Sequence, residues 1–102
     1  MEKLSFEGSQ ITDVYEDAST LFIKLVDGSN TQYSLQLSEA KFKKKIKTGR
    51  LTDGEVYGIL GKPLDGKIQI PFHGSGDFEL EFCMEDQKVT VFCLQIRLQY
   101  ES

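Results

Sequence analysis

The chain has 102 residues, of which 39% are hydrophobic and 27% charged, and its formal net charge is −4 at pH 7. These values exclude a disordered chain and predict a single domain over residues 1–102 with one core. No apolar run reaches the roughly 20 residues that a membrane-spanning helix needs, and no signal-peptide core follows Met1. We therefore expect a cytoplasmic protein that does not enter a membrane.

The first third of the chain predicts strands. Residues 4–6 and 11–15 form either one strand broken at Gly8 and Ser9 or two short strands. Residues 21–26 and 32–37 then alternate between apolar and polar side chains, as the two strands of a hairpin do. Their apolar sides share a face only if Leu25 opposes Tyr33. That pairing requires a loop of three or five residues, in which Gly28 or Asn30 adopts the left-handed conformation.

The middle of the chain changes character. Ser38 is a good N-cap, and Phe42 and Ile46 lie four residues apart, so residues 38–47 predict a basic helix that ends near Gly49. Residues 52–60 leave two alternatives open. Thr52 to Glu55 resembles a capping box, which favours a short helix with Val56, Tyr57, Ile59 and Leu60 behind it, whereas glycines at 54, 58 and 61 favour an extended segment. A turn at residues 63–66 and a strand at residues 68–72 follow.

The last third predicts a second hairpin. Phe72-His73-Gly74-Ser75 repeats the pattern of Phe6-Glu7-Gly8-Ser9, and each motif precedes two alternating runs. The apolar sides of residues 78–84 and 90–96 match if Phe82 opposes Phe92, with an odd-numbered loop near residues 86–88. Cys83 and Cys93 are then diagonal neighbours on one face, a poor geometry for a disulfide, so we expect free thiols.

These elements predict an α+β fold that is mainly β. We expect an antiparallel curled sheet of about six or seven strands, shaped as a half-barrel or a sandwich. The central basic helix is expected to pack against one edge or end of this sheet.

Charge is unevenly distributed along the chain. Six of the twelve basic residues lie in residues 41–50 with no acid among them, so the rest of the chain has six bases against sixteen acids. A basic helix can bind phosphates. However, no aromatic or arginine cluster accompanies these lysines, so nucleic acid is disfavoured as a partner. The bases are Lys41, Lys43, Lys44, Lys45, Lys47 and Arg50.

Acidic residues gather on the second hairpin. In the predicted register they lie on its outward face, where Arg97 opposes Asp77 as a cross-strand ion pair. This face is our candidate docking surface for a protein partner. Its predicted partner-binding residues are Asp77, Glu79, Glu81, Glu85, Gln95 and Arg97.

Catalytic and metal-binding patterns are weak. His73, Ser75 and Asp77 lie within five residues, but this composition is typical of a glycine-rich turn, and a triad normally converges from separate elements. One histidine and two cysteines without a CxxC pattern are too few for a zinc site. We expect no enzyme activity, no cofactor and no metal.

The size, acidity, missing leader and paired hairpins resemble in style many small bacterial proteins, some of which are immunity partners of secreted toxins. No diagnostic motif accompanies this resemblance. The leading hypothesis is a non-enzymatic protein-binding module, immunity- or inhibitor-like, with a second copy of the chain among its candidate partners. One alternative is nucleic-acid contact through residues 41–50. Another is a small-molecule cavity in the curled sheet that uses Phe22, Tyr57 and Tyr100.

Overall fold

The computed structural model describes residues 3–58, 67–69 and 72–101. Every regular element in these residues is a β-strand, and they contain no helix. The predicted α+β class is therefore wrong, and the described part of the chain is all-β. Its strands are β1 (Lys3–Ser5), β2 (Gln10–Asp17), β3 (Thr20–Val26), β4 (Gln32–Ser38), β5 (Lys41–Phe42), β6 (Gly49–Tyr57), β7 (Lys67–Gln69), β8 (Phe72–Met84) and β9 (Lys88–Tyr100).

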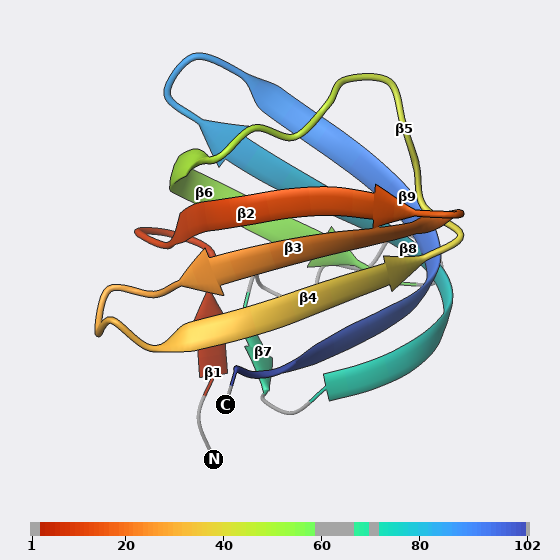
Figure 1. Cartoon of the computed structure of the whole chain (residues 1–102), viewed down its shortest axis with the longest axis horizontal. Helices are drawn as coiled ribbons and strands as arrows, with labels where there is room; N and C mark the ends of the chain where they lie inside the picture. The colour runs from red at the N-terminus through yellow and green to blue at the C-terminus, as the bar shows by residue number, and fades with distance from the viewer. Residues whose placement is uncertain (1–2, 59–66, 70–71, 102) are drawn as a thin grey trace.

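The main sheet closes on itself instead of forming a half-barrel or a sandwich. Its seven strands follow the order β4-β3-β2-β6-β8-β9-β5, and β4 also pairs with β9. One edge of β9 pairs with β8, and the other edge changes partner along the strand. On that edge β4 pairs with residues 95–100, and β5 pairs with residues 91 and 92, all antiparallel. Strands β1 and β7 form a separate two-stranded sheet. Figure 1 shows β2, β3 and β4 facing β8 and β9 across the molecule.

The predicted register of the first hairpin is confirmed. Leu25 opposes Tyr33 across β3 and β4, and the other apolar residues follow in step. Asp27 N–H donates to the carbonyl oxygen of Thr31 at 3.0 Å, which leaves a three-residue loop. Asn30 takes the left-handed conformation in that loop, with φ of 65°. Local turn chemistry thus decides this register, as the sequence predicts.

The predicted helix over residues 38–47 is wrong. Glu39 adopts a left-handed conformation, with φ of 54°, which ends β4 and is incompatible with a right-handed helix. Ala40 N–H donates to the carbonyl oxygen of Ser19 at 2.9 Å, and β5 pairs with β9 directly afterwards. The apolar side chains of Phe42 and Ile46 pack against the core from this extended segment. Two apolar residues do not form the broad stripe that stabilises a surface helix, so tertiary pairing prevails.

Residues 49–57 form β6, so the extended alternative is correct for the described part of residues 52–60. The N-terminal segment forms two strands, β1 and β2, instead of one broken strand. Strand β7 covers part of the predicted strand at residues 68–72. The predicted turn at residues 63–66 lies outside the described residues, as do Ile59 and Leu60.

The predicted register of the second hairpin is wrong. Phe82 opposes Val89, and Phe92 opposes Glu79. Met84 N–H donates to the carbonyl oxygen of Gln87 at 2.7 Å, so the loop has two residues and not an odd number. An even-numbered loop reverses the facing of the last strand relative to the sequence-based pairing. Val89, Val91 and Cys93 therefore enter the core, and Phe92 faces solvent.

The two four-residue motifs adopt different structures. Residues 6–9 form a turn, in which Gly8 has φ of 81°, whereas residues 72–75 belong to β8. Farther along β8, the ladder with β9 shifts between Ser75 and Phe78. Gly76 lies within this bulge with φ of 141°, a conformation that favours glycine. The predicted glycine-rich turn at residues 73–77 is thus a bulged strand.

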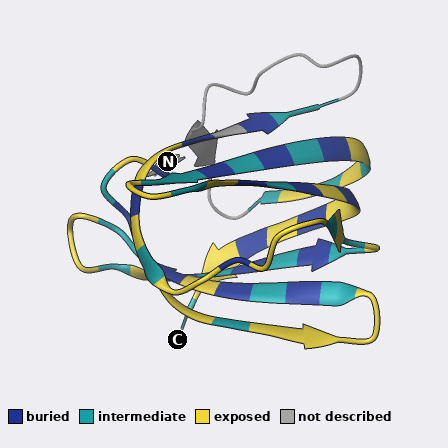
Figure 2. Cartoon of the chain, turned by 90° about the horizontal axis from the view of Figure 1, so that it is seen from above, coloured by how far each residue is buried: buried dark blue, intermediate teal, exposed yellow. Residues whose placement is uncertain are grey.

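Apolar side chains fill the interior of the closed sheet. Figure 2 shows buried residues alternating along the strands with partly buried or exposed ones. Phe6, in the turn after β1, lies against Phe82 with its ring centroid 5.5 Å away. Backbone hydrogen bonds tie this turn to β6: Gly8 N–H donates to the oxygen of Leu51 at 3.0 Å, and Leu51 N–H donates to that of Ser9 at 2.7 Å. The turn thus holds Phe6 over the core.

Candidate functional site

Three strands bring an outward-facing row of side chains together. Phe92 of β9 is paired with Lys41 of β5 on one side and with Glu79 of β8 on the other. Directly paired residues share a face, so the three side chains leave the sheet on the same side. A base, an aromatic ring and an acid therefore stand next to one another, although they come from distant parts of the sequence.

Two apolar side chains of β9 are exposed on this face. Phe92 is 52% exposed and Leu94 is 48% exposed. Tyr15 has similar exposure, but its ring stacks on Phe22 with centroids 4.8 Å apart. We call Phe92 and Leu94, with the flanking charges, the Phe92 surface; the flanking residues are Lys41, Asp77 and Glu79.

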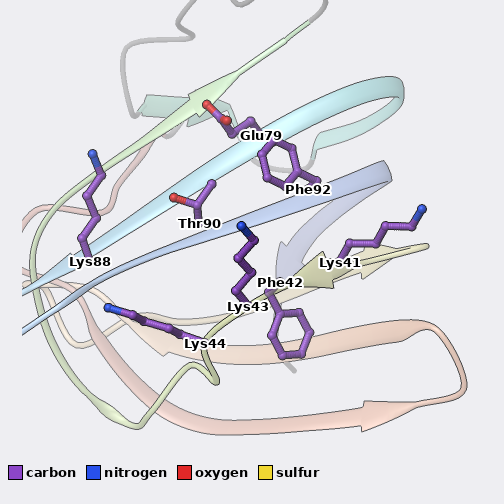
Figure 3. A pocket seen from close by; sticks show the side chains of 8 residues that line it. All are labelled: Lys41, Phe42, Lys43, Lys44, Glu79, Lys88, Thr90 and Phe92. Atoms are coloured by element: carbon purple, nitrogen blue, oxygen red, sulfur yellow. The ribbon is translucent and has the colours of Figure 1, made fainter.

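One hollow lies beside Phe92 on the basic side of this surface. Its volume is about 540 Å³, within the usual size range of ligand pockets. Figure 3 shows Lys43 extending from the chain after β5 toward β9, while Phe42 points away from Phe92. We call this hollow the basic groove; it is lined by Lys41, Phe42, Lys43, Lys44, Glu79, Lys88, Thr90 and Phe92.

A second hollow lies on the other side of Phe92. It has a volume of about 320 Å³ and contains more acidic than basic side chains. The charge of the surface therefore changes from basic to acidic along β9. The lining residues are Glu39, Lys41, Asp77, Phe78, Phe92, Cys93 and Leu94.

One ion pair lies at the end of the basic groove. Lys88 Nζ is 3.3 Å from Glu81 Oε1. A hydrogen bond to Glu81 and the charge of that carboxylate raise the pKa of Lys88 above its usual value. Because this lysine is exposed, the pair adds little to stability. Its effect is to neutralise Lys88 and Glu81, and Glu79 is the one acid among the described residues that line the groove.

The predicted partner-binding residues lie on β8, in the β8–β9 loop and on β9. Asp77, Glu79 and Glu81 face outward from β8, and Glu85 is exposed in the hairpin loop. Gln95 and Arg97 are exposed on β9, where they oppose Ser75 and His73. The predicted pairing of Arg97 with Asp77 is therefore wrong.

The basic residues of 41–50 do not form one face. Lys41, Lys43 and Lys44 line the basic groove. Lys45 lines a different hollow next to Tyr15, and Lys47 and Arg50 line another near the loop of the β8–β9 hairpin. Only three of these six basic residues thus contribute to the basic groove.

His73, Ser75 and Asp77 occupy every second position of β8, and all three are exposed. The Cα atoms of alternate residues in an extended strand are about 7 Å apart, which is farther than a hydrogen bond reaches. Among the described residues, no group of three or more His, Cys, Asp or Glu side chains is arranged to hold a metal ion.

Both cysteines are free thiols. They are not diagonal neighbours: Cys83 opposes Lys88 near the hairpin loop, whereas Cys93 opposes Phe78. Burial raises the pKa of the Cys93 thiol to about 12. Cys83 is less buried, and its pKa is also raised, mainly by burial. Neither thiol has the lowered pKa that marks a reactive cysteine.

The aromatic residues proposed for a small-molecule cavity do not converge. Phe22 stacks on Tyr15, and the ring of Tyr100 lies 5.3 Å from that of Tyr33 at the end of β9. Tyr57 lies on β6, opposite Glu79. The interior that a ligand would need is filled by the core side chains.

Sequence reasoning missed the central residues of this surface, Phe92 and Leu94. A signal was present, because residues 89–94 are apolar on both faces of the strand apart from Thr90. One of the two faces had to be exposed or covered by another element. The length of the hairpin loop decides which of the two faces enters the core.

Comparisons with protein-family models, curated proteins and solved structures find no match to this chain. Within the described residues, no helix has the length and apolar character needed to cross a bilayer.

Proposed function

We propose that this protein is a binding module that docks a protein partner on the Phe92 surface. The supporting observation is the half-exposed Phe92, set in the middle of three strands between Lys41 and Glu79. Exposed aromatic residues framed by polar side chains are typical of the centre of protein interfaces. The flanking charges of opposite sign would orient the partner.

A second candidate function is binding of single-stranded nucleic acid. It is favoured by the position of Phe92 beside Lys41 and Lys43, because bases stack on aromatic rings in basic grooves. Against it, the hollows on the two sides of Phe92 each contain an acid, Glu79 in the basic groove and Asp77 in the other. Both would repel a phosphate backbone, which is negative along its whole length. Protein binding therefore ranks first.

Affinity capture with matched variants tests the proposal. The wild-type chain, Phe92→Ser and Tyr15→Ser are immobilised and exposed to a lysate of the source cells, and retained proteins are quantified by mass spectrometry. Tyr15 is the control, since it is an aromatic residue of similar exposure away from the Phe92 surface. We expect a partner that the wild type and Tyr15→Ser retain equally and that Phe92→Ser loses by about tenfold or more. Equal retention by all three chains, or no retained protein, would contradict the proposal.

A further inference from the structure

The basic groove lies beside an incompletely paired stretch of β9. Residues 88–93 pair with β8 on one side, but β5 covers only residues 91 and 92 on the other. In the described part of the chain, residues 88–90 therefore have a strand partner on one side alone. The chain after β5 bends at Lys43 and Lys44 instead of continuing the ladder. An uncovered strand edge presents backbone N–H and C=O groups that another extended chain can pair with.

The charge of the groove selects what can pair there. Lys41, Lys43 and Lys44 line it, and no ion pair joins them to an acid among the described residues. Lys88 is neutralised by Glu81, and Glu79 is the one acid in the lining. The surplus of positive charge favours an acidic occupant, although the whole chain is acidic.

We propose that the basic groove binds an extended acidic segment of a protein partner, which adds to the edge of β9 at residues 88–90 as a further strand. This inference rests on the proposed function and names the partner's chemistry. Backbone hydrogen bonds to β9 would hold the segment, and alternate side chains would reach Phe92 and the lysines. A nucleic acid could bind the lysines but could not complete a ladder with both the N–H and the C=O groups of a strand edge, so the strand edge favours a peptide.

Titration of the ¹⁵N-labelled 102-residue chain tests this assignment. The probes are a heptapeptide that alternates glutamate with valine, its lysine counterpart, a version of the glutamate peptide with N-methylated backbone amides, and a ten-nucleotide oligothymidine. We expect the glutamate peptide to shift the amide resonances of residues 88–90 and to slow their hydrogen exchange. The N-methylated peptide should bind at least about tenfold more weakly, because it cannot complete the ladder.

Charge variants identify the groove. Lys41→Gln, Lys43→Gln and Lys44→Gln together should weaken the glutamate peptide about tenfold at about 0.05 M salt, and less at higher salt. The matched control is Lys24→Gln, Lys45→Gln and Lys47→Gln, which removes the same charge outside the groove. It should change the affinity by less than about twofold.

Several outcomes would overturn the inference. These are equal or tighter binding of the lysine peptide, equal binding of the N-methylated peptide, or no shift at residues 88–90 with about 5 mM glutamate peptide. Tighter binding of the oligothymidine would assign the groove to nucleic acid instead. If capture from the lysate depends on Phe92 while the peptide titration fails, the docking function stands and this inference falls. If both fail, the proposed function falls as well.

Discussion

Asp27 organises the loop of the first hairpin. Its Oδ1 accepts hydrogen bonds from the backbone N–H of Ser29 at 2.8 Å and of Thr31 at 2.9 Å, and its Oδ2 accepts one from the Tyr33 hydroxyl at 2.7 Å. Its carbonyl oxygen accepts the N–H of Asn30 at 3.0 Å. One carboxylate therefore links the loop to Tyr33 in the core, which helps to fix the register of this hairpin.

The titration of Asp27 follows from these contacts. Burial, the largest single effect, raises the pKa of this carboxyl, but the hydrogen bonds from Thr31, Tyr33 and Ser29 together lower it below its usual value. A carboxyl whose pKa is lower in the folded than in the unfolded state stabilises the fold fully above the unfolded pKa, about 3.9. This contribution disappears as the pH falls through the lower, folded pKa.

Replacing Asp27 should thus have a pH-dependent cost. We expect Asp27→Ala to lower the free energy of unfolding by about 1 to 3 kcal/mol at pH 7, because three donors lose their acceptor. The difference from wild type should shrink toward pH 2, where the wild-type carboxyl is protonated. Urea unfolding at both pH values measures it, with the exposed Asp86→Ala as control. A cost that is the same at both pH values would show that the carboxylate charge is not involved.

At the level of elements, the two hairpins show what the sequence could and could not predict. Asp27, Gly28 and Asn30 specify the first loop, so alternation and turn chemistry agree there. Around Glu85 and Asp86 no residue type specifies the loop length, and residues 89–94 are apolar on both faces. Both registers were then compatible with the pattern, and core packing decided between them.

The helix prediction failed for a related reason. Residues 38–47 have helical capping and propensity, but the hydrogen-bonding groups of β9 pair with Lys41 and Phe42 instead. Local sequence preference carries no information about pairing with a strand that lies about fifty residues farther along the chain. Gly54 is a second example. A glycine is needed there because Phe6 and the backbone of β8 approach β6 closely, and not because of helix propensity.

A side chain at position 54 of β6 should destabilise the fold. A Cβ atom there would lie 2.8 Å from Phe6 Cβ and 2.9 Å from the backbone oxygen of Glu81. Because Phe6 is packed against Phe82, it has little room to move. We expect Gly54→Ala to lower the free energy of unfolding by about 1 to 3 kcal/mol.

The control for position 54 is Gly28→Ala, because a Cβ atom at that glycine has no neighbour within 4 Å. Gly28→Ala should change the stability by no more than about 0.5 kcal/mol. Thermal or urea unfolding of both variants measures the difference. Equal effects at the two positions would argue against the close approach of Phe6 to β6.

At the scale of the whole molecule, closure of the sheet creates the candidate surface. It places β5, from the middle of the chain, beside β9 at its end, and so sets lysines next to an acidic strand. The sequence identified the acidic and basic groups separately, including Asp77, Glu79 and Lys41. It could not predict that they flank one exposed ring, because their proximity depends on long-range strand order. The docking face predicted from the sequence is mainly acidic, with Gln95 and Arg97 beside the four acids, whereas the proposed Phe92 surface has Lys41 on one side of the ring and Glu79 on the other.

The proposed docking surface depends most on the register of the β8–β9 hairpin, in which Phe82 of β8 lies in the core and Phe92 of β9 lies at the surface. Urea unfolding of Phe82→Ala and Phe92→Ala compares the two positions directly. We expect Phe82→Ala to lose about 3 to 5 kcal/mol of unfolding free energy, because it leaves a cavity. Phe92→Ala should lose no more than about 0.5 kcal/mol, as exposed positions do. A loss of about 3 kcal/mol or more at Phe92, comparable to the loss at Phe82, is what the sequence-based register predicts, and it would contradict the observed register and the docking surface built on it.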